Sequence, residues 1–204
     1  MDELELLKKD WQSNRTEYPE LSYDEIYKMS HAKSSSIVKW IFYISLIEFA
    51  IGLILILLNP KIEGQIEFPI WVEIMSYATF PVIGIFIYFF YKNYKNITAT
   101  DNIRKLIKSI LKTRRTVKYY VLFNLVMAGV FSCVGLYVGY VTSEGGAEQF
   151  SANAHFAEYA TLGVVIVIVT AGIVALFYGI YYLLYGILLK RLNRNYKELK
   201  KLEV

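Results

Sequence analysis

Few residues in this sequence are of the types that perform acid–base, metal or nucleophilic chemistry. The 204 residues include two histidines, His31 and His155, and one cysteine, Cys133. His155 and Glu158 have the i, i+3 spacing of two metal ligands, but a divalent site needs more ligands than these. The GxSxG and HExxH motifs, the P-loop and the glycine-rich dinucleotide turn are all missing. We therefore expect no catalytic residue, no metal site and no cofactor.

The acid that stands out is Glu48, the one charged residue between Lys39 and Lys61. If this segment crosses a bilayer, Glu48 lies about ten residues, or roughly 15 Å, into the span and close to the midplane. A bare carboxylate there costs several kcal/mol, so we expect Glu48 to face other helices and to be protonated.

Pro81 offers Glu48 a partner, because a proline inside a helix leaves the carbonyl of Tyr77 without its donor and favours a kink. We expect Glu48 to donate to that carbonyl or to a hydroxyl at a similar depth, of Thr79, Ser132 or Thr170. The alternative is a proton- or cation-binding site of a transporter, for which an oligomer would have to gather several copies of this single acid.

The elements that position these residues follow from where charges are missing. Four intervals of 21, 18, 25 and 31 residues contain no charge except Glu48, and each is long enough to cross about 30 Å of hydrocarbon. Their lack of a polar face excludes a soluble bundle. We predict an all-α integral-membrane four-helix bundle over 37–192, with spans at about 38–59, 70–92, 117–141 and 160–190.

The basic residues predict the orientation of this bundle. Of 22 lysines and arginines, 21 lie before the first span, between the second and third, or after the fourth. The positive-inside rule then places both termini and the middle connection in the cytoplasm. The cytosolic parts are an N-terminal arm at 1–36 and a tail at 193–204. Tyrosines at the inner ends of the spans are expected to act as interfacial anchors, among them Tyr120, Tyr178, Tyr181, Tyr182 and Tyr185.

The N-terminal arm is predicted to form two short helices. Leu4, Leu7 and Trp11 make a narrow apolar stripe, which either packs back on the protein or lipid surface or docks a cytosolic partner. Ser22 and Glu25 fit a capping box, so a second helix begins there and ends at a bend in the serines at 34–36.

The middle connection is predicted to hold a basic amphipathic helix at 101–113, with an apolar stripe opposite its cations. We expect it to lie flat on the anionic inner leaflet, either as a simple connection or as a sensor of lipid charge or a holder of a partner. No base-stacking aromatic residues interleave the cations, so we expect no nucleic-acid partner. These membrane-surface cations are Arg104, Lys105, Lys108 and Lys112.

Small residues predict where helices approach closely. Gly135 and Gly139 have the GxxxG spacing, and Gly172, Gly179 and Gly186 are seven apart. Packing within one bundle accounts for both stripes, and a homo-oligomer, such as a homodimer, is the alternative.

The segments MDELELLKKDW, LSYDEIYKM and SSSIVKWIFYISLIEF resemble an uncharacterised family of small four-span bacterial inner-membrane proteins. The resemblance implies a bacterial inner membrane and a fold of four helices. Some members of that family carry an automatic label of β-carotene 15,15′-monooxygenase. Carotenoid-cleaving oxygenases hold iron with four histidines, whereas this sequence has two on opposite sides of the membrane, and no family catalytic residue maps onto it.

Two functions therefore remain from different classes. The first is a non-enzymatic adaptor or regulator that holds a cytosolic protein partner at the inner membrane. The second is a small transporter or channel subunit that uses Glu48. A membrane oxygenase, as the family label suggests, is the remote alternative.

Overall fold

The computed structural model describes residues 5, 22–58, 68–100 and 102–202, and the regular structure of these residues is entirely helical. Four of the helices are long and apolar enough to cross a membrane, so the chain is a multi-pass membrane protein. In chain order the elements are α2 (Tyr23–Leu57), α3 (Ile70–Thr98), α4 (Ile103–Ser143), α5 (Ala147–Asn153), α6 (Phe156–Tyr181), the π-helical turn η1 (Tyr182–Gly186) and α7 (Ile187–Leu202).

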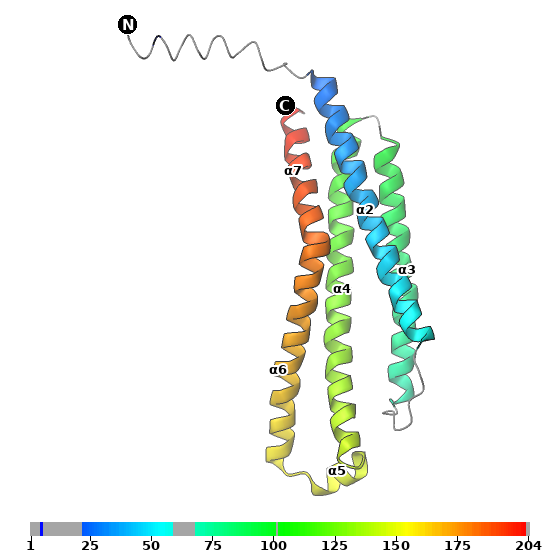
Figure 1. The fold of residues 1–204 in the computed structure, drawn as a ribbon, viewed down its shortest axis with the longest axis vertical. Helices are drawn as coiled ribbons and strands as arrows, with labels where there is room; N and C mark the ends of the chain where they lie inside the picture. Colours follow the sequence, from blue (N-terminus) through cyan, green and yellow to red (C-terminus); the bar gives the residue numbers. More distant parts are fainter. Residues whose placement is uncertain (1–4, 6–21, 59–67, 101, 203–204) are drawn as a thin grey trace.

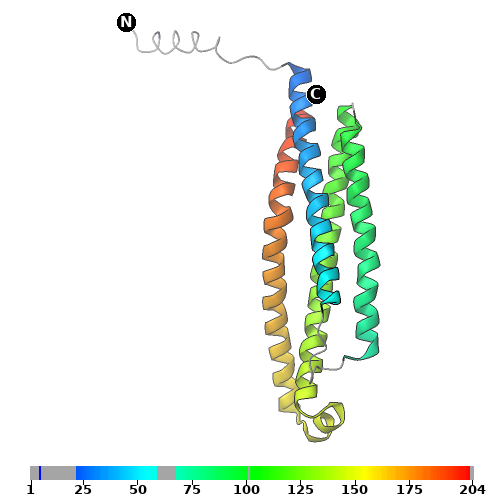
Figure 2. The ribbon, with the colours of Figure 1, turned by 45° about the vertical axis from the view of Figure 1, so that its right-hand side comes forward.

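The long helices form an elongated antiparallel bundle (Figure 1). Helix α4 packs against α3 on one side and α6 and α7 on the other, while α2 packs against α3 and α7. In the views of Figures 1 and 2, α2 ends before the far end of the bundle, which α4 and α6 reach. The end from which α2 starts and at which α7 finishes is called the basic end below, and it comprises 22–39, 92–118 and 190–202.

Helix α2 joins the predicted arm to the predicted first span without a break. Its first residue follows Ser22, whose backbone N–H donates to Glu25 Oε2 at 2.9 Å, so the predicted helix start is confirmed. The predicted bend at 34–36 was wrong, because α2 stays helical through it. Ser34 is fully buried there and accepts a hydrogen bond from Asn195 Nδ2 at 3.3 Å, so packing against α7 occupies the face that would have to open for a bend.

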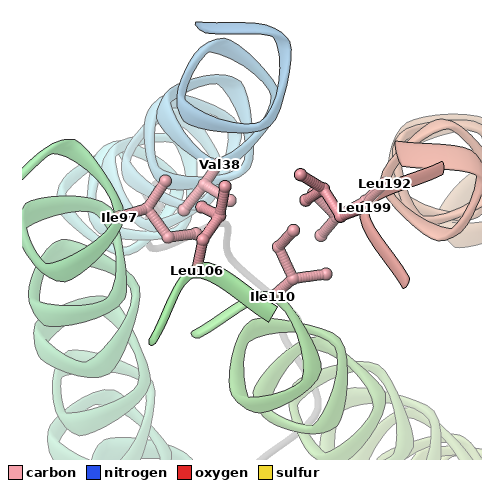
Figure 3. Packing of buried hydrophobic residues seen from close by; sticks show 6 residues of the cluster. All are labelled: Val38, Ile97, Leu106, Ile110, Leu192 and Leu199. Atoms are coloured by element: carbon pink, nitrogen blue, oxygen red, sulfur yellow. The ribbon is translucent and has the colours of Figure 1, made fainter. Parts of the chain in front are cut away.

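The amphipathic helix of the middle connection does not lie flat on a membrane, and this prediction was wrong. It is the first part of α4, which runs unbroken for 41 residues. Its apolar stripe meets protein instead of lipid. Figure 3 shows Leu106 and Ile110 pointing into a cluster built by all four long helical segments. Its fully buried members, called the basic-end core below, are Val38, Ile97, Leu106, Ile110, Leu192 and Leu199.

The basic end is therefore a folded extension of the bundle. At 1.5 Å per residue α4 is about 60 Å long, twice the roughly 30 Å of a hydrocarbon layer. Residues 193–202 of the predicted tail belong to α7, in which Leu192, Asn195 and Leu199 share one buried face. Hydrogen bonds also tie α2 to the end of α3: the Tyr27 hydroxyl donates to the Thr100 carbonyl at 3.0 Å, and His31 Nε2 donates to the Ile97 carbonyl at 2.7 Å.

The opposite end closes with α5, a short helix that the sequence pattern did not predict. Gly145 and Gly146, with φ of 89° and 102°, make the turn from α4 into α5 in a conformation that glycine adopts without strain. The side chain of Phe150 then packs between the rings of Tyr140 and Tyr159, at centroid distances of 5.7 and 5.0 Å. These contacts join α4 to α6.

Candidate functional site

The structure brings Glu48 of α2 together with two tyrosines from other elements. The Tyr120 hydroxyl of α4 donates to Glu48 Oε2 at 2.5 Å, and the Tyr185 hydroxyl of η1 donates to the same oxygen at 3.2 Å. The other carboxyl oxygen, Oε1, is buried and has no hydrogen-bond partner among the described residues. One acid thus links three helical elements, and one of its two carboxyl oxygens accepts no hydrogen bond from the described residues.

The predicted partners of Glu48 were wrong. Thr79 donates to the Met75 carbonyl at 3.0 Å, four residues back in its own helix. Ser132 and Thr170 pair with each other at 3.2 Å and join α4 to α6. Helix α3 continues through Pro81, and the side chain of Tyr77 is 61% exposed on its outer face.

The physical reason for this error is depth. Tyr120 follows Lys118 by two residues, and Tyr185 precedes Lys190 by five, so the carboxyl group lies near the basic end of the spans and not at the midplane. Helical side chains tilt toward the helix N-terminus, which for Glu48 is the basic end. Counting residues from Lys39 to the Cα of Glu48 therefore overstated how deep its carboxyl group lies.

The surroundings of Glu48 are aromatic and tightly packed. The rings of Phe90 and Phe86 meet the Tyr120 ring edge-on at 5.4 and 5.6 Å, and Tyr181 stacks on Tyr185 at 6.0 Å. Tyr120 and Tyr185 are each only 1% exposed. The group of Glu48, Tyr120, Tyr181 and Tyr185 is called the Glu48 cluster below. Its chemistry is that of one carboxyl group beside neutral hydroxyl donors, which suits the uptake and release of a proton.

These tyrosines were predicted to be interfacial anchors, and their contact with Glu48 was not predicted. The spacing of Tyr181 and Tyr185 by four places them on one helix face, which was the available signal. The π-helical turn was not visible in the sequence. A π turn holds an extra residue, which rotates everything after it by roughly 100° relative to a regular helix. It lets Tyr185 reach Glu48 while α7 still turns Leu192 and Leu199 inward.

Four of the five glycines in the predicted stripes do not mark close approaches of helices within the described part of the chain. A methyl group added at Gly135, Gly172 or Gly179 would meet no neighbouring atom within 4 Å, and one at Gly186 would meet the ring of Tyr182. The expectation of intrachain packing is wrong at these positions, and Gly139 is half-buried. Homo-oligomerisation stays a prediction. Glycines that do face another helix are Gly129, whose added methyl would lie 3.6 Å from Val174, and Gly52, at 3.5 Å from Phe80.

The remaining candidate residues either stabilise a helix end or lie outside the residues that the structure describes. His155 and Glu158 cap α6, where the His155 backbone N–H donates to Glu158 Oε2 at 3.1 Å. Within the residues that the structure describes, no group of three or more histidine, cysteine, aspartate or glutamate residues could hold a metal. The partner-docking residues Leu4, Leu7 and Trp11 lie outside the described residues.

The four cations predicted for the middle connection are exposed on the surface of the protein. Arg104, Lys105, Lys108 and Lys112 are all exposed on α4, on the side away from the basic-end core. Helix α4 is capped by Asn102, whose side-chain oxygen accepts from the Arg104 backbone N–H at 2.9 Å. Over the whole basic end, the sequence has 18 lysines and arginines and four acids.

Comparison with known proteins places these features in a family but attaches no activity to them. No curated protein and no solved structure matches the chain. A family model described as a domain of unknown function (DUF8845) matches residues 24–204, which includes every described helix except the first residue of α2. The chain therefore belongs to the family of this domain of unknown function.

Proposed function

We propose that the protein is a non-enzymatic adaptor or regulator of the bacterial inner membrane, with both termini in the cytoplasm, that holds an acidic protein partner at its basic end. One observation carries this proposal: the helices continue past their apolar segments into a packed extension with its own buried core. On such a packed helix the backbone of the surface cations is already ordered, whereas cations on a mobile loop would lose backbone conformational entropy when a partner binds.

The positive charge of the basic end supports the proposal that the partner is acidic. The excess of cations at the basic end creates a positive potential, which steers acidic surfaces toward it and disfavours basic ones. The exposed face of α4 offers Lys105, Lys108 and Lys112 on a helix whose opposite side is locked by Leu106 and Ile110. A protein that binds this face would contact cations spaced along a fixed helix.

Copurification from native membranes tests the adaptor. The variant Lys105→Gln/Lys108→Gln/Lys112→Gln removes three charges from α4 and leaves the basic-end core intact. The matched control, Lys197→Gln/Lys200→Gln/Lys201→Gln, removes the same charge from the exposed side of α7. We expect the α4 variant to lose an acidic partner that wild type retains at low salt, and the α7 variant to keep it. Equal retention of all bound proteins by wild type and the α4 variant would refute the proposal.

Deletion of residues 1–21 separates the contribution of the N-terminal segment, because it leaves α2 intact from its cap at Ser22 onward. If Leu4, Leu7 and Trp11 dock the same partner, the deletion lowers retention without changing its dependence on the α4 cations. This cut is cleaner than a deletion to residue 30, which would remove Tyr27 and the buried Ser30 from the basic end.

A proton-coupled transporter is the second candidate, and the Glu48 cluster favours it. A buried carboxyl group with one unpartnered oxygen, set beside a π-helical turn, combines two features that recur at functional sites. Proton uptake by proteoliposomes tests it directly, with Glu48→Gln as the variant. Loss of uptake in this variant, together with equal retention of all bound proteins by wild type and the α4 variant, would favour the transporter over the adaptor.

A further inference from the structure

A groove runs along the outside of the bundle between α2 and the segment that joins η1 to α7. It has a volume of about 280 Å³ and is shallow, with most of its surface open. Six of its seven lining residues are apolar, and the seventh is Arg191. The apolar members are Trp40, Ile44, Leu183, Leu184, Ile187 and Leu188.

The position of the groove along the spans decides what surrounds it. Trp40 follows Lys39, and Arg191 follows Lys190, so the two residues mark the level at which the apolar segments of α2 and α7 end. Tryptophan and arginine at that level lie among lipid headgroups. The leucines and isoleucines of the groove extend from there into the hydrocarbon layer, where acyl chains are the neighbouring molecules.

Charge decides which lipid fits. Arg191 is exposed, and residues 184–197 contain Lys190, Arg191, Arg194 and Lys197 but no acid. Glu48 of α2 contacts Tyr120 and Tyr185 and is not among the residues that line the groove. Basic pockets between membrane helices on this side bind anionic headgroups.

The geometry points to a binding site for one anionic phospholipid of the leaflet at the basic end. Its phosphate pairs with Arg191, its glycerol region lies beside Trp40, and one acyl chain lies along Ile44, Leu184 and Leu188. The volume is near the lower limit of about 300 Å³ for ligand pockets, which suits a single chain segment whose remainder stays in the bilayer. This inference rests on the cytoplasmic placement of the basic end proposed above, but not on the adaptor role.

The lipid would touch the same π-helical turn that holds Glu48. Leu183 and Leu184 line the groove, and the next residue, Tyr185, donates to Glu48 Oε2. Leu184 and Leu188 also pack against the buried cluster of Tyr120 and Tyr185. An acyl chain seated on these leucines therefore stabilises the π turn from its outer side.

Quenching of Trp40 fluorescence by brominated lipids tests the site in bilayers. The full-length chain with Trp11→Phe and Trp71→Phe retains Trp40 as its single tryptophan. In phosphatidylcholine bilayers, we expect brominated phosphatidylglycerol to quench Trp40 at about fivefold lower lipid fraction than brominated phosphatidylcholine, because one arginine beside the headgroup distinguishes the two. The variant Arg191→Gln should bring this ratio to about one.

The matched control is Lys118→Gln, which removes one exposed charge where the apolar segment of α4 begins and lies outside the groove. It should leave the ratio unchanged, and circular dichroism checks that both variants keep wild-type helicity. Native mass spectrometry of unmodified wild type gives a second readout, in which retained phosphatidylglycerol should exceed retained phosphatidylcholine.

Three results would overturn the inference. Equal quenching by the two lipids in the Trp40 protein would show no headgroup selectivity. An equal loss of selectivity in Arg191→Gln and Lys118→Gln would assign it to the general charge of the basic end. Selectivity that emerges only after removal of residues 1–21, or only on dilution to monomers, would give the groove to this chain's own N-terminal segment or to a second copy.

Discussion

Ile110 and Leu111 are neighbours in α4 that differ in burial, and this difference distinguishes a packed basic end from a helix on the membrane surface. Ile110 is 0% exposed, while Leu111 is 43% exposed. Truncating a fully buried isoleucine to alanine costs about 2–5 kcal/mol, because apolar contacts are lost and a cavity remains. Truncating an exposed leucine costs about 0.5 kcal/mol or less.

The cost of Ile110→Ala should extend to α7, because Leu192 and Leu199 share the basic-end core with Ile110. A loss of 2 kcal/mol or more raises hydrogen exchange through opening of this core about 30-fold or more. Mass-spectrometric exchange of peptides covering 192–199 measures this change. We expect the large increase in Ile110→Ala and almost none in Leu111→Ala.

A helix that lay flat on lipid would give a different result. Both residues would then lose similar contact with acyl chains on truncation, and neither change would reach α7. Equal and small effects of the two variants on exchange at 192–199 would therefore refute the packed arrangement of α4 and α7.

The other predictions concern the Glu48 cluster and the glycine stripe. Tyr120→Phe should lower the free energy of unfolding in detergent by about 1–3 kcal/mol. The loss should exceed that of Tyr185→Phe, because Tyr120→Phe removes the 2.5 Å hydrogen bond and leaves the longer one of 3.2 Å. Glu48→Gln should keep wild-type folding and assembly in size-exclusion profiles, since an amide oxygen still accepts from both hydroxyls, and a complete loss of assembled protein would contradict the described contacts. Gly172→Ala should fold like wild type because its added methyl meets no atom within 4 Å, and a drop in crosslinked dimer would identify the stripe as a homodimer face.

The features of this fold that could be predicted are those that depend on residues close together in the sequence. Charge-free intervals predicted four long helices because a bilayer excludes charge along a whole segment, and the Ser22–Glu25 cap predicted where α2 begins. The stripe of Leu106 and Ile110 was also correct as a pattern. What it could not predict was whether lipid or protein covers it, because that depends on α7, some 85 residues further along the chain.

The partners of Glu48 were unpredictable for a related reason. They depend on how three helices are offset along their axes, and an offset of one turn changes which hydroxyl is level with the acid. The π turn adds a local rotation that no composition pattern signals. Tyr185 was therefore predicted to be an interfacial anchor, although it is 1% exposed. The sequence therefore identified the acid and missed what surrounds it.

The adaptor proposal is tested most directly by photo-crosslinking from the exposed face of α4 in native membranes. A photoreactive residue replaces Lys108, and a matched one replaces Glu158, which is exposed at the opposite end of the bundle. The proposal predicts a discrete adduct with an acidic protein from position 108, weakened by added salt and absent from position 158. No protein adduct from position 108, or the same adducts from both positions, would contradict it.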